Sequence, residues 1–245
     1  MLGGTSTYTA GCLAERQNIL TDDLIECPSH LSDEEAAALP LCGLTAWRAV
    51  RTKGGVERGN RVVVTGVGGG VALMAVRFCV ALGAKVVVTS GSQAKIDRAV
   101  KELGVIGGVS YKSRSWAAEA EKLLEGKIDV VIDGAGGQIV EAVVKSIAEG
   151  GRIVVYGITT LQPPRYPVTA MLKGVDLLGS TLGSRKEFRE MVEFVGREGV
   201  RPVVDRVGKG LDVGVVDELF GVMKRGEQFG KLVVRVRERA EEAKL

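Results

Sequence analysis

A cluster of glycines after a short apolar run offers the most direct chemistry in this sequence. The run Arg61–Thr65 contains three consecutive valines and no turn residue, and residues 66–72 then read Gly-Val-Gly-Gly-Gly-Val-Ala. Glycines let the backbone turn sharply and approach a ligand, and the free N–H groups of a following helix attract phosphate. We therefore predict a pyrophosphate-binding turn. The alternative is an ordinary strand-to-helix connection, because a lone glycine run is weak evidence.

Small hydroxyl and basic side chains follow the next apolar run, Lys85–Thr89. Residues 89–95 read Thr-Ser-Gly-Ser-Gln-Ala-Lys, without an acid. Dinucleotide-binding folds that prefer NAD usually place Asp or Glu near this point to bind the ribose 2′-hydroxyl. A carboxylate would repel a 2′-phosphate, whereas Ser90 and Lys95 suit one. We predict NADP(H) rather than NAD(H). The alternative is that Lys95 is a solvated helix residue and Ser90 a turn residue.

The elements that would position these residues alternate between strand and helix. Strands separated by helical crossovers form a parallel sheet with helices on both faces, and ligands bind at the carboxyl ends of the strands. The sequence thus predicts an α/β, Rossmann-type doubly wound fold. The expected strands lie at 61–65, 85–90, 108–111, 128–133, 152–156, 175–180 and 230–235, and the expected helices at 73–82, 116–124, 138–148, 186–199 and 213–225.

Composition and charge exclude several classes of function. The 245 residues are 45% hydrophobic and 26% charged, and a net charge of +3 is too small to indicate a nucleic-acid or membrane partner. The single histidine, His30, excludes a catalytic histidine pair or a metal site built from several histidines. The four cysteines have no paired spacing, so we expect a reducing compartment and no disulfide framework. With no secretory signal visible, a cytoplasmic location is expected.

Several stretches, taken in order, carry a family resemblance. Residues 39–47 (Leu-Pro-Leu-Cys-Gly-Leu-Thr-Ala-Trp), 64–72, 132–136 (Ile-Asp-Gly-Ala-Gly), 179–188 and 229–233 (Phe-Gly-Lys-Leu-Val) resemble the medium-chain dehydrogenase/reductase superfamily. The resemblance is closest to its zinc-type alcohol dehydrogenase-like and quinone oxidoreductase-like branches. Because the match covers nearly the whole chain, it is specific.

The resemblance implies a division of the chain into three parts. Residues 11–15 resemble the end of the family's GroES-like catalytic domain, most of which would lie upstream of Met1. We expect residues 1–48 to be the C-terminal part of that domain and 49–199 to be the Rossmann dinucleotide-binding domain. Residues 200–245 would return to the catalytic domain and end in a charged tail. Remnants of a GroES-like β domain would therefore lie at both ends of the chain.

Cys42 stands where zinc-dependent relatives place a late ligand of the catalytic zinc. A catalytic zinc needs three protein ligands, and the upstream Cys and His partners are missing from this sequence. The alternative is a small buried cysteine near the start of a helix. We expect no metal.

The resemblance also assigns contacts to a cofactor, residue by residue. Tyr111 and Arg225 are equally consistent with ordinary surface residues, and no catalytic residue is identified. The pyrophosphate would be lined by Gly66, Gly68, Gly69, Gly70 and Val71. The adenosine 2′-phosphate would be held by Ser90, Lys95, Tyr111 and Arg225. Along the ribose and nicotinamide would lie Thr45, Gly134, Gly157 and Lys231.

These assignments imply an NADP(H)-dependent, zinc-independent oxidoreductase. It would transfer a hydride between the nicotinamide cofactor and a small carbonyl, enone or quinone. The alternative is a truncated, catalytically impaired NADP-binding protein. The expected partner in the reaction is a small-molecule substrate. Family members often dimerise by pairing the edge strand that matches Val175–Thr181, so a second copy of the chain is also an expected partner.

Overall fold

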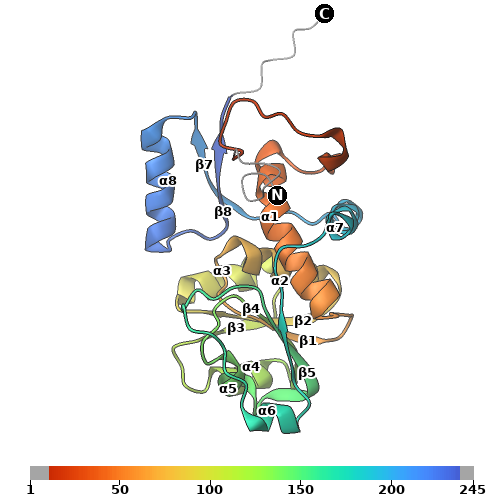
Figure 1. The fold of residues 1–245 in the computed structure, drawn as a ribbon. Helices are drawn as coiled ribbons and strands as arrows, with labels where there is room; N and C mark the ends of the chain where they lie inside the picture. The colour runs from red at the N-terminus through yellow and green to blue at the C-terminus, as the bar shows by residue number, and fades with distance from the viewer. Residues whose placement is uncertain (1–10, 238–245) are drawn as a thin grey trace, which may run out of the picture.

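A six-stranded parallel sheet forms the centre of the computed structural model, which describes residues 11–237 (Figure 1). The strand order is β3-β2-β1-β4-β5-β6, and every pair of neighbours is parallel. The chain adds β2 and β3 on one side of β1 and β4, β5 and β6 on the other, so the strand order reverses between β1 and β4. Doubly wound folds bind their ligands at this point. The predicted Rossmann-type fold is confirmed. The strands are β1 Arg61–Val64, β2 Lys85–Ser90, β3 Gly107–Ser110, β4 Ile128–Asp133, β5 Ile147–Val155 and β6 Asp176–Gly179.

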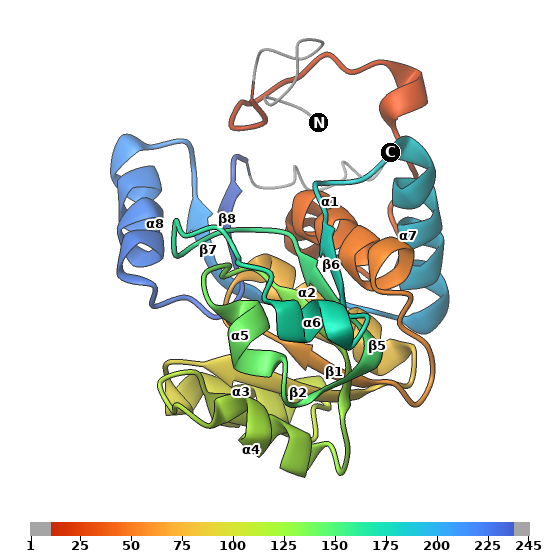
Figure 2. The same ribbon diagram turned by 60° about the horizontal axis from the view of Figure 1, so that its bottom comes forward.

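Helices cover both faces of this sheet and bury it in two separate apolar clusters. Helices α1 and α7 lie side by side on one face (Figure 2). That face carries α1 Asp33–Trp47, α2 Gly70–Ala81, α3 Gln93–Leu103 and α7 Arg185–Glu198, and the other face carries α4 Trp116–Leu123, α5 Ile139–Val143 and α6 Val168–Leu172. None of the helices within residues 11–237 is both long enough and apolar enough to cross a membrane.

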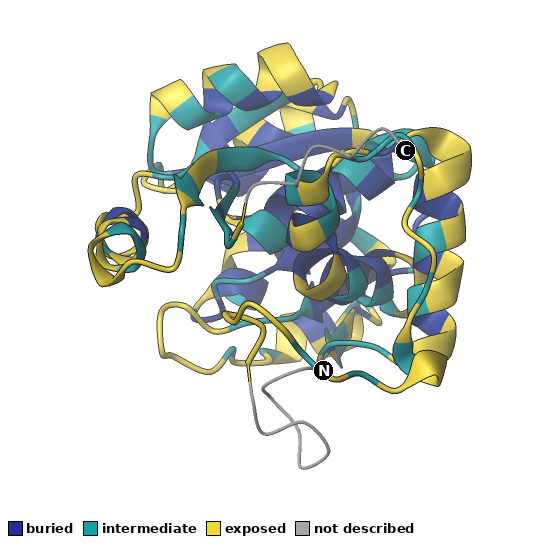
Figure 3. Cartoon of the chain, turned by 90° about the horizontal axis from the view of Figure 1, so that it is seen from above, coloured by how far each residue is buried: buried dark blue, intermediate teal, exposed yellow. Residues whose placement is uncertain are grey.

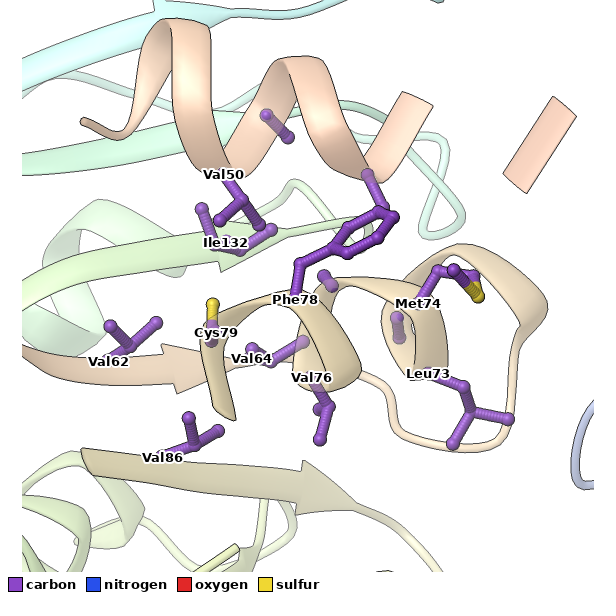
Figure 4. Packing of buried hydrophobic residues seen from close by; sticks show 14 of the residues in the cluster. Val50, Val62, Val64, Leu73, Met74, Val76, Phe78, Cys79, Val86 and Ile132 are labelled. Atoms are coloured by element: carbon purple, nitrogen blue, oxygen red, sulfur yellow. The ribbon is translucent and has the colours of Figure 1, made fainter. Parts of the chain in front are cut away.

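Phe78 of α2 lies at the centre of the larger cluster and is fully buried. Its ring meets that of Trp47 in α1 edge to face, with ring centroids 5.3 Å apart, and that of Phe194 in α7 at 6.0 Å. Figure 4 shows Phe78 pointing from α2 towards the helix that carries Val50. Buried residues run along the strands, and exposed residues mark the outer sides of the helices (Figure 3). These contacts hold α1 and α7 against α2, whose first turn begins at the glycine cluster.

The start of α1 confirms a local prediction from the sequence. The Ser32 hydroxyl accepts a hydrogen bond from the N–H of Glu35, and the Glu35 carboxylate accepts one from the N–H of Ser32. This reciprocal pair satisfies two backbone donors that a helix leaves unpaired at its start. Helix α1 continues past Trp47 into a π-helical turn, η2, at Arg48–Lys53, and a short 3₁₀ turn, η1, lies at Thr21–Asp23.

A second, two-stranded parallel sheet lies beside the main one. It consists of β7 Val204–Lys209 and β8 Lys231–Arg235, and α8 Val213–Arg225 connects the two strands. The division of the chain at residues 48 and 199, with GroES-like remnants at its ends, stays a prediction. Residues 1–10 and 238–245 of those end segments lie outside the described residues.

One predicted helix is much shorter than expected. The sequence predicts a helix from about 138 to 148, but α5 ends at Val143 and β5 begins at Ile147. Ile147 pairs with Ile128 of β4, and the register shifts before Val130 pairs with Arg152. Pairing with β4 therefore extends β5 towards its amino end, through residues whose local pattern also suits a helix.

Candidate functional site: a glycine turn at the strand reversal

The glycine turn connects the end of β1 to the start of α2. Gly66 has a φ of +69° and Gly68 a φ of +126°, a backbone region that side chains with a Cβ rarely adopt. Residues of the neighbouring strand β2 hold the turn in place. The N–H of Gly66 donates to the Thr89 hydroxyl at 3.2 Å, and the N–H of Val67 donates to the Thr89 carbonyl at 2.8 Å.

Open space borders the turn where the prediction places a pyrophosphate. A Cβ added to Gly66 or to Gly69 would meet no atom within 4 Å. Gly69 is the N-cap of α2, no side chain caps this helix start, and its first turn contains no acid. The uncapped N–H groups and the helix dipole make such a place favourable to an anion. The residues present therefore fit the phosphates of a dinucleotide.

Two lysines flank the turn. Lys95, from α3, lies against Gly68, and its Nζ would be 3.1 Å from a Cβ added there. The same Nζ donates to the carbonyl of Gly226 at 2.7 Å. On the other side, the Lys231 side chain packs on Gly70, with Cδ 2.7 Å from the position of an added Cβ. The structure thus brings Lys95, Lys231 and the glycine turn together.

Cys42 also packs against Gly70, with its Sγ 2.8 Å from the position of an added Cβ. Burial raises the pKa of the Cys42 thiol, and the adjacent Lys231 opposes this shift without reversing it. Within residues 11–237, no three His, Cys, Asp or Glu side chains gather where they could hold a metal ion. Among the described residues, Cys42 therefore lacks the two further ligands that a catalytic zinc needs.

A buried carboxylate, which the sequence analysis did not single out, lies at the end of β4, across from the glycine turn where the strand order reverses. Asp133 ends β4, and its Oδ1 accepts a 2.5 Å hydrogen bond from the Thr65 hydroxyl. Its Oδ2 accepts from the N–H of Gly136 at 2.7 Å. Burial raises the pKa of Asp133, and these hydrogen bonds oppose the shift. The signal in the sequence is its place at the end of a buried strand, next to the glycines at 134, 136 and 137.

The ends of β4 and β5 approach each other through two more glycines of the predicted site. A Cβ on Gly157 would lie 3.1 Å from the Gly134 carbonyl oxygen, and a Cβ on Gly134 would lie 2.6 Å from the Tyr156 hydroxyl. A side chain at Gly134 would therefore force the Tyr156 ring to move, and one at Gly157 would crowd the Gly134 carbonyl. Burial, together with the nearby Asp133 and Cys42, raises the pKa of Tyr156, so its hydroxyl remains protonated at neutral pH.

The predicted 2′-phosphate residues lie near the ends of β2 and β3 and of α8. Ser90 is buried, and its hydroxyl accepts a 3.2 Å hydrogen bond from the N–H of Ser92. Tyr111 is exposed, with its hydroxyl directly over Gly91. Arg225, the last residue of α8, immediately precedes Gly226, the residue that Lys95 contacts.

Thr45 and Val71 complete the predicted set. Thr45 is buried in α1, where its hydroxyl donates to the Leu41 carbonyl at 2.7 Å. It lies about one helical turn after Cys42, which does contact the glycine turn. Val71 lies in the first turn of α2 and is partly buried. The structure therefore places Lys95 and Lys231 beside the glycine turn. The Thr45 hydroxyl, in contrast, makes its hydrogen bond within its own helix.

The sheet order, the glycine turn at the strand reversal and the flanking cations together define a nucleotide-binding fold of the dehydrogenase type. Comparison with known families agrees. Residues 70–197 match the model of the zinc-binding dehydrogenase family. The chain therefore belongs to this family, within the medium-chain dehydrogenase/reductase superfamily of oxidoreductases.

Individual relatives extend this match. A zinc-type alcohol dehydrogenase-like protein of Leptosphaeria maculans is 47% identical over 216 residues, covering 85% of this chain and 60% of the relative. One from Schizosaccharomyces pombe is 32% identical and covers 96% and 68%. The crystal structure of an NAD-dependent alcohol dehydrogenase superposes with a TM-score of 0.84 at 34% identity, covering 93% of this chain and 66% of that one. The chain thus spans about two thirds or less of the length of these relatives.

Proposed function

We propose that this chain binds NADP(H) at the glycine turn and acts in a zinc-independent oxidoreductase. The reaction transfers a hydride between the nicotinamide and a small carbonyl, enone or quinone. One observation carries the choice of cofactor. Residues 89–95, at the end of β2, contain no acid, and the Lys95 ammonium lies beside the glycine turn. A cation favours a 2′-phosphate at this position, whereas the carboxylate typical of NAD-binding folds would repel it.

The names of the relatives support hydride transfer. The proposed preference for NADP over NAD rests on the residues of this chain. The superposed structure is named as an NAD-dependent alcohol dehydrogenase. An acryloyl-coenzyme A reductase of Sulfurisphaera tokodaii is 29% identical over 95% of this chain. A carbonyl and a conjugated thioester are both electron-poor carbon acceptors, which is consistent with the substrate class proposed here.

The cofactor, when bound, supplies the hydride, and the protein binds and orients it. The glycine turn and the start of α2 hold the pyrophosphate through backbone N–H groups. Ser90, Lys95, Tyr111 and Arg225 lie on the side of the 2′-phosphate. The residues assigned to the ribose and nicotinamide are Gly134 and Gly157 at the ends of β4 and β5, Lys231 beside the turn, and Thr45 in α1.

A titration followed by a turnover assay tests this proposal. NADPH and NADH are titrated separately while protein-bound nicotinamide fluorescence is recorded, and reduction of a quinone and an enone is then followed by loss of NADPH absorbance. We expect NADPH to bind about tenfold or more tightly than NADH, and NADPH to be consumed. Equal affinity for both would contradict the choice of cofactor. Binding without turnover would support the alternative of an NADP-binding protein that does not catalyse the reaction.

We also propose that two copies of the chain pair through β6. This strand lies at the edge of the six-stranded sheet, with β5 as its one neighbour among the strands of residues 11–237. An unpaired strand edge presents N–H and C=O groups that a second strand can bond. Several apolar side chains of α6, the helix that precedes β6, are exposed, among them Val168, Met171 and Leu172. Burial of such side chains would add to the stability of a dimer.

A further inference from the structure

Arg225, assigned by resemblance to the 2′-phosphate, is already paired with an acid. Its Nε donates to Glu227 Oε1 at 2.6 Å, and its Nη2 donates to Oε2 at 3.1 Å. Both side chains are exposed. Hydrogen bonding between them lowers the pKa of Glu227 and raises that of Arg225, so both groups are charged at neutral pH.

This ion pair lies next to the cation that faces the glycine turn. Gly226 separates Arg225 from Glu227 and ends α8 with a φ of +63°. Its carbonyl accepts the 2.7 Å hydrogen bond from Lys95, whose Nζ lies against Gly68. The N–H of Gly230 donates to the Gly68 carbonyl at 3.0 Å, which joins the same loop to the turn a second time. The Arg225–Glu227 pair is therefore part of the surroundings of the predicted 2′-phosphate position.

The loop after α8 thus carries an acid, Glu227, next to the residue that Lys95 contacts, whereas residues 89–95 carry none. We propose that Glu227 is a specificity-determining residue that opposes NADP(H) selection. It occupies the guanidinium of Arg225, and it places a negative charge near the predicted 2′-phosphate position. A 2′-phosphate must compete with this carboxylate for Arg225, whereas an uncharged ribose hydroxyl does not. This inference rests on the proposed function.

Two cations, Arg206 and Lys95, and two acids also lie around the pair: Glu218 raises the pKa of Arg225 through its charge, and Asp205 pairs with Arg206 at 3.5 Å. The charge of Arg206 also lowers the pKa of Glu227. Replacing Glu227 leaves three cations near this loop, namely Arg225, Arg206 and Lys95. The ion pair is solvent-exposed and therefore weak, so a phosphate can displace it. The net effect of Glu227 is then a reduction of phosphate affinity rather than a block.

Calorimetric titration with 2′,5′-ADP and with 5′-AMP tests the inference, because the two ligands differ only in the 2′-phosphate. We expect Glu227→Gln to bind 2′,5′-ADP about three- to tenfold more tightly at low salt. Its affinity for 5′-AMP should stay within about twofold. Asp217→Asn is the matched control: it removes one negative charge from exposed α8 without touching Arg225, and both affinities should stay unchanged.

A second variant and a change of salt separate the effect of charge from other causes. Glu227→Ala should reproduce the gain, and about 0.5 M salt should abolish most of it. Thermal unfolding should be the same in all variants, because the pair is exposed. If Glu227→Gln and Asp217→Asn bind 2′,5′-ADP equally, the inference is wrong while the proposed function stands. If the unsubstituted chain binds neither 2′,5′-ADP nor NADPH, both are wrong.

Discussion

The Thr65 hydroxyl and the Asp133 carboxylate join the ends of β1 and β4 through a 2.5 Å hydrogen bond at the point where the strand order reverses. Both side chains are buried, and the Thr65 oxygen also accepts from the N–H of Gly134 at 3.2 Å. One side chain therefore connects the strand that leads into the glycine turn with the loop that begins at Gly134.

Replacing Thr65 by valine keeps the shape of the side chain and removes this connection. The Asp133 carboxylate would lose a donor and the Gly134 N–H an acceptor, so we expect the free energy of unfolding to fall by about 1–3 kcal/mol. Urea denaturation measures the loss. Thr159→Val, at an exposed position, is the control and should leave the midpoint unchanged. Equal midpoints for the two variants would show that the Thr65 hydrogen bond does not stabilise the fold.

Gly69 offers a cleaner test of the glycine turn than Gly68. A side chain at Gly68 would be strained by its φ of +126°, whereas Gly69 has a φ of −79° and open space around an added Cβ. Asp is also a favourable N-cap, so Gly69→Asp should fold with undiminished stability. Its charge would lie where the pyrophosphate binds, and we expect NADPH binding to be lost. Gly69→Ala is the uncharged control. NADPH binding unchanged by Gly69→Asp would mean that this cluster is only a turn.

Lys95→Ala should narrow the preference for NADPH over NADH. A charge-assisted contact with phosphate is worth about 1.5–3 kcal/mol, so NADPH affinity should fall about tenfold or more while NADH affinity changes little. Fluorescence titration of both cofactors measures this difference. Lys101→Ala removes an exposed lysine from the same helix and serves as the control. If both variants lose NADPH affinity equally, general charge and not Lys95 is responsible.

Glu187 should make stability depend on pH in the acid range. Burial raises its pKa, but hydrogen bonds from Ser184, Thr52 and Arg48 outweigh this and hold the pKa at about 2, below the ordinary value of 4.5. The stabilisation is therefore complete above about pH 4.5 and is lost as pH falls towards 2. Glu187→Gln should lower the free energy of unfolding at pH 7 by about 2–4 kcal/mol and flatten its dependence on pH in this window.

Glu193→Gln is the control for that measurement, because Glu193 lies exposed on the same helix. Denaturation midpoints are compared at a series of pH values from 7 down to the acid limit of folding. A Glu187→Gln curve that falls with acid as steeply as that of the unsubstituted chain would assign the acid sensitivity to other carboxylates.

Gly179→Pro should separate the proposed dimer. The N–H of Ser180 donates to Val155 of β5 at 2.9 Å, so in a parallel strand the preceding N–H, that of Gly179, points away from β5 towards the open edge. Proline removes this donor and leaves the ladder with β5 intact. Light scattering should report a dimer for the unsubstituted chain and for Gly179→Ala, and a monomer for Gly179→Pro. A dimer in all three would place the interface elsewhere.

Local patterns in the sequence were sufficient for much of the fold. Helix α8 has the bounds expected from its periodicity, 213–225, and Ser32 and Glu35 form the capping box that their spacing indicates. These features depend on residues within one or two turns of each other. The strands β1, β2 and β4 were also predictable, because buried parallel strands read as continuous β-branched runs. The sheet type and the place of the glycine turn follow from them.

Contacts between distant segments decided the rest. The pairing of Ile147 with Ile128 made a strand of residues expected to be helical. Lys95 and Gly226 are 131 positions apart, yet their hydrogen bond brings the end of α8 to the glycine turn. The sequence by itself determined the nucleotide-binding fold and the basic, acid-free end of β2. Only the tertiary structure placed Glu227 beside that cationic site, because a charge acts through distance in space and not through separation along the chain.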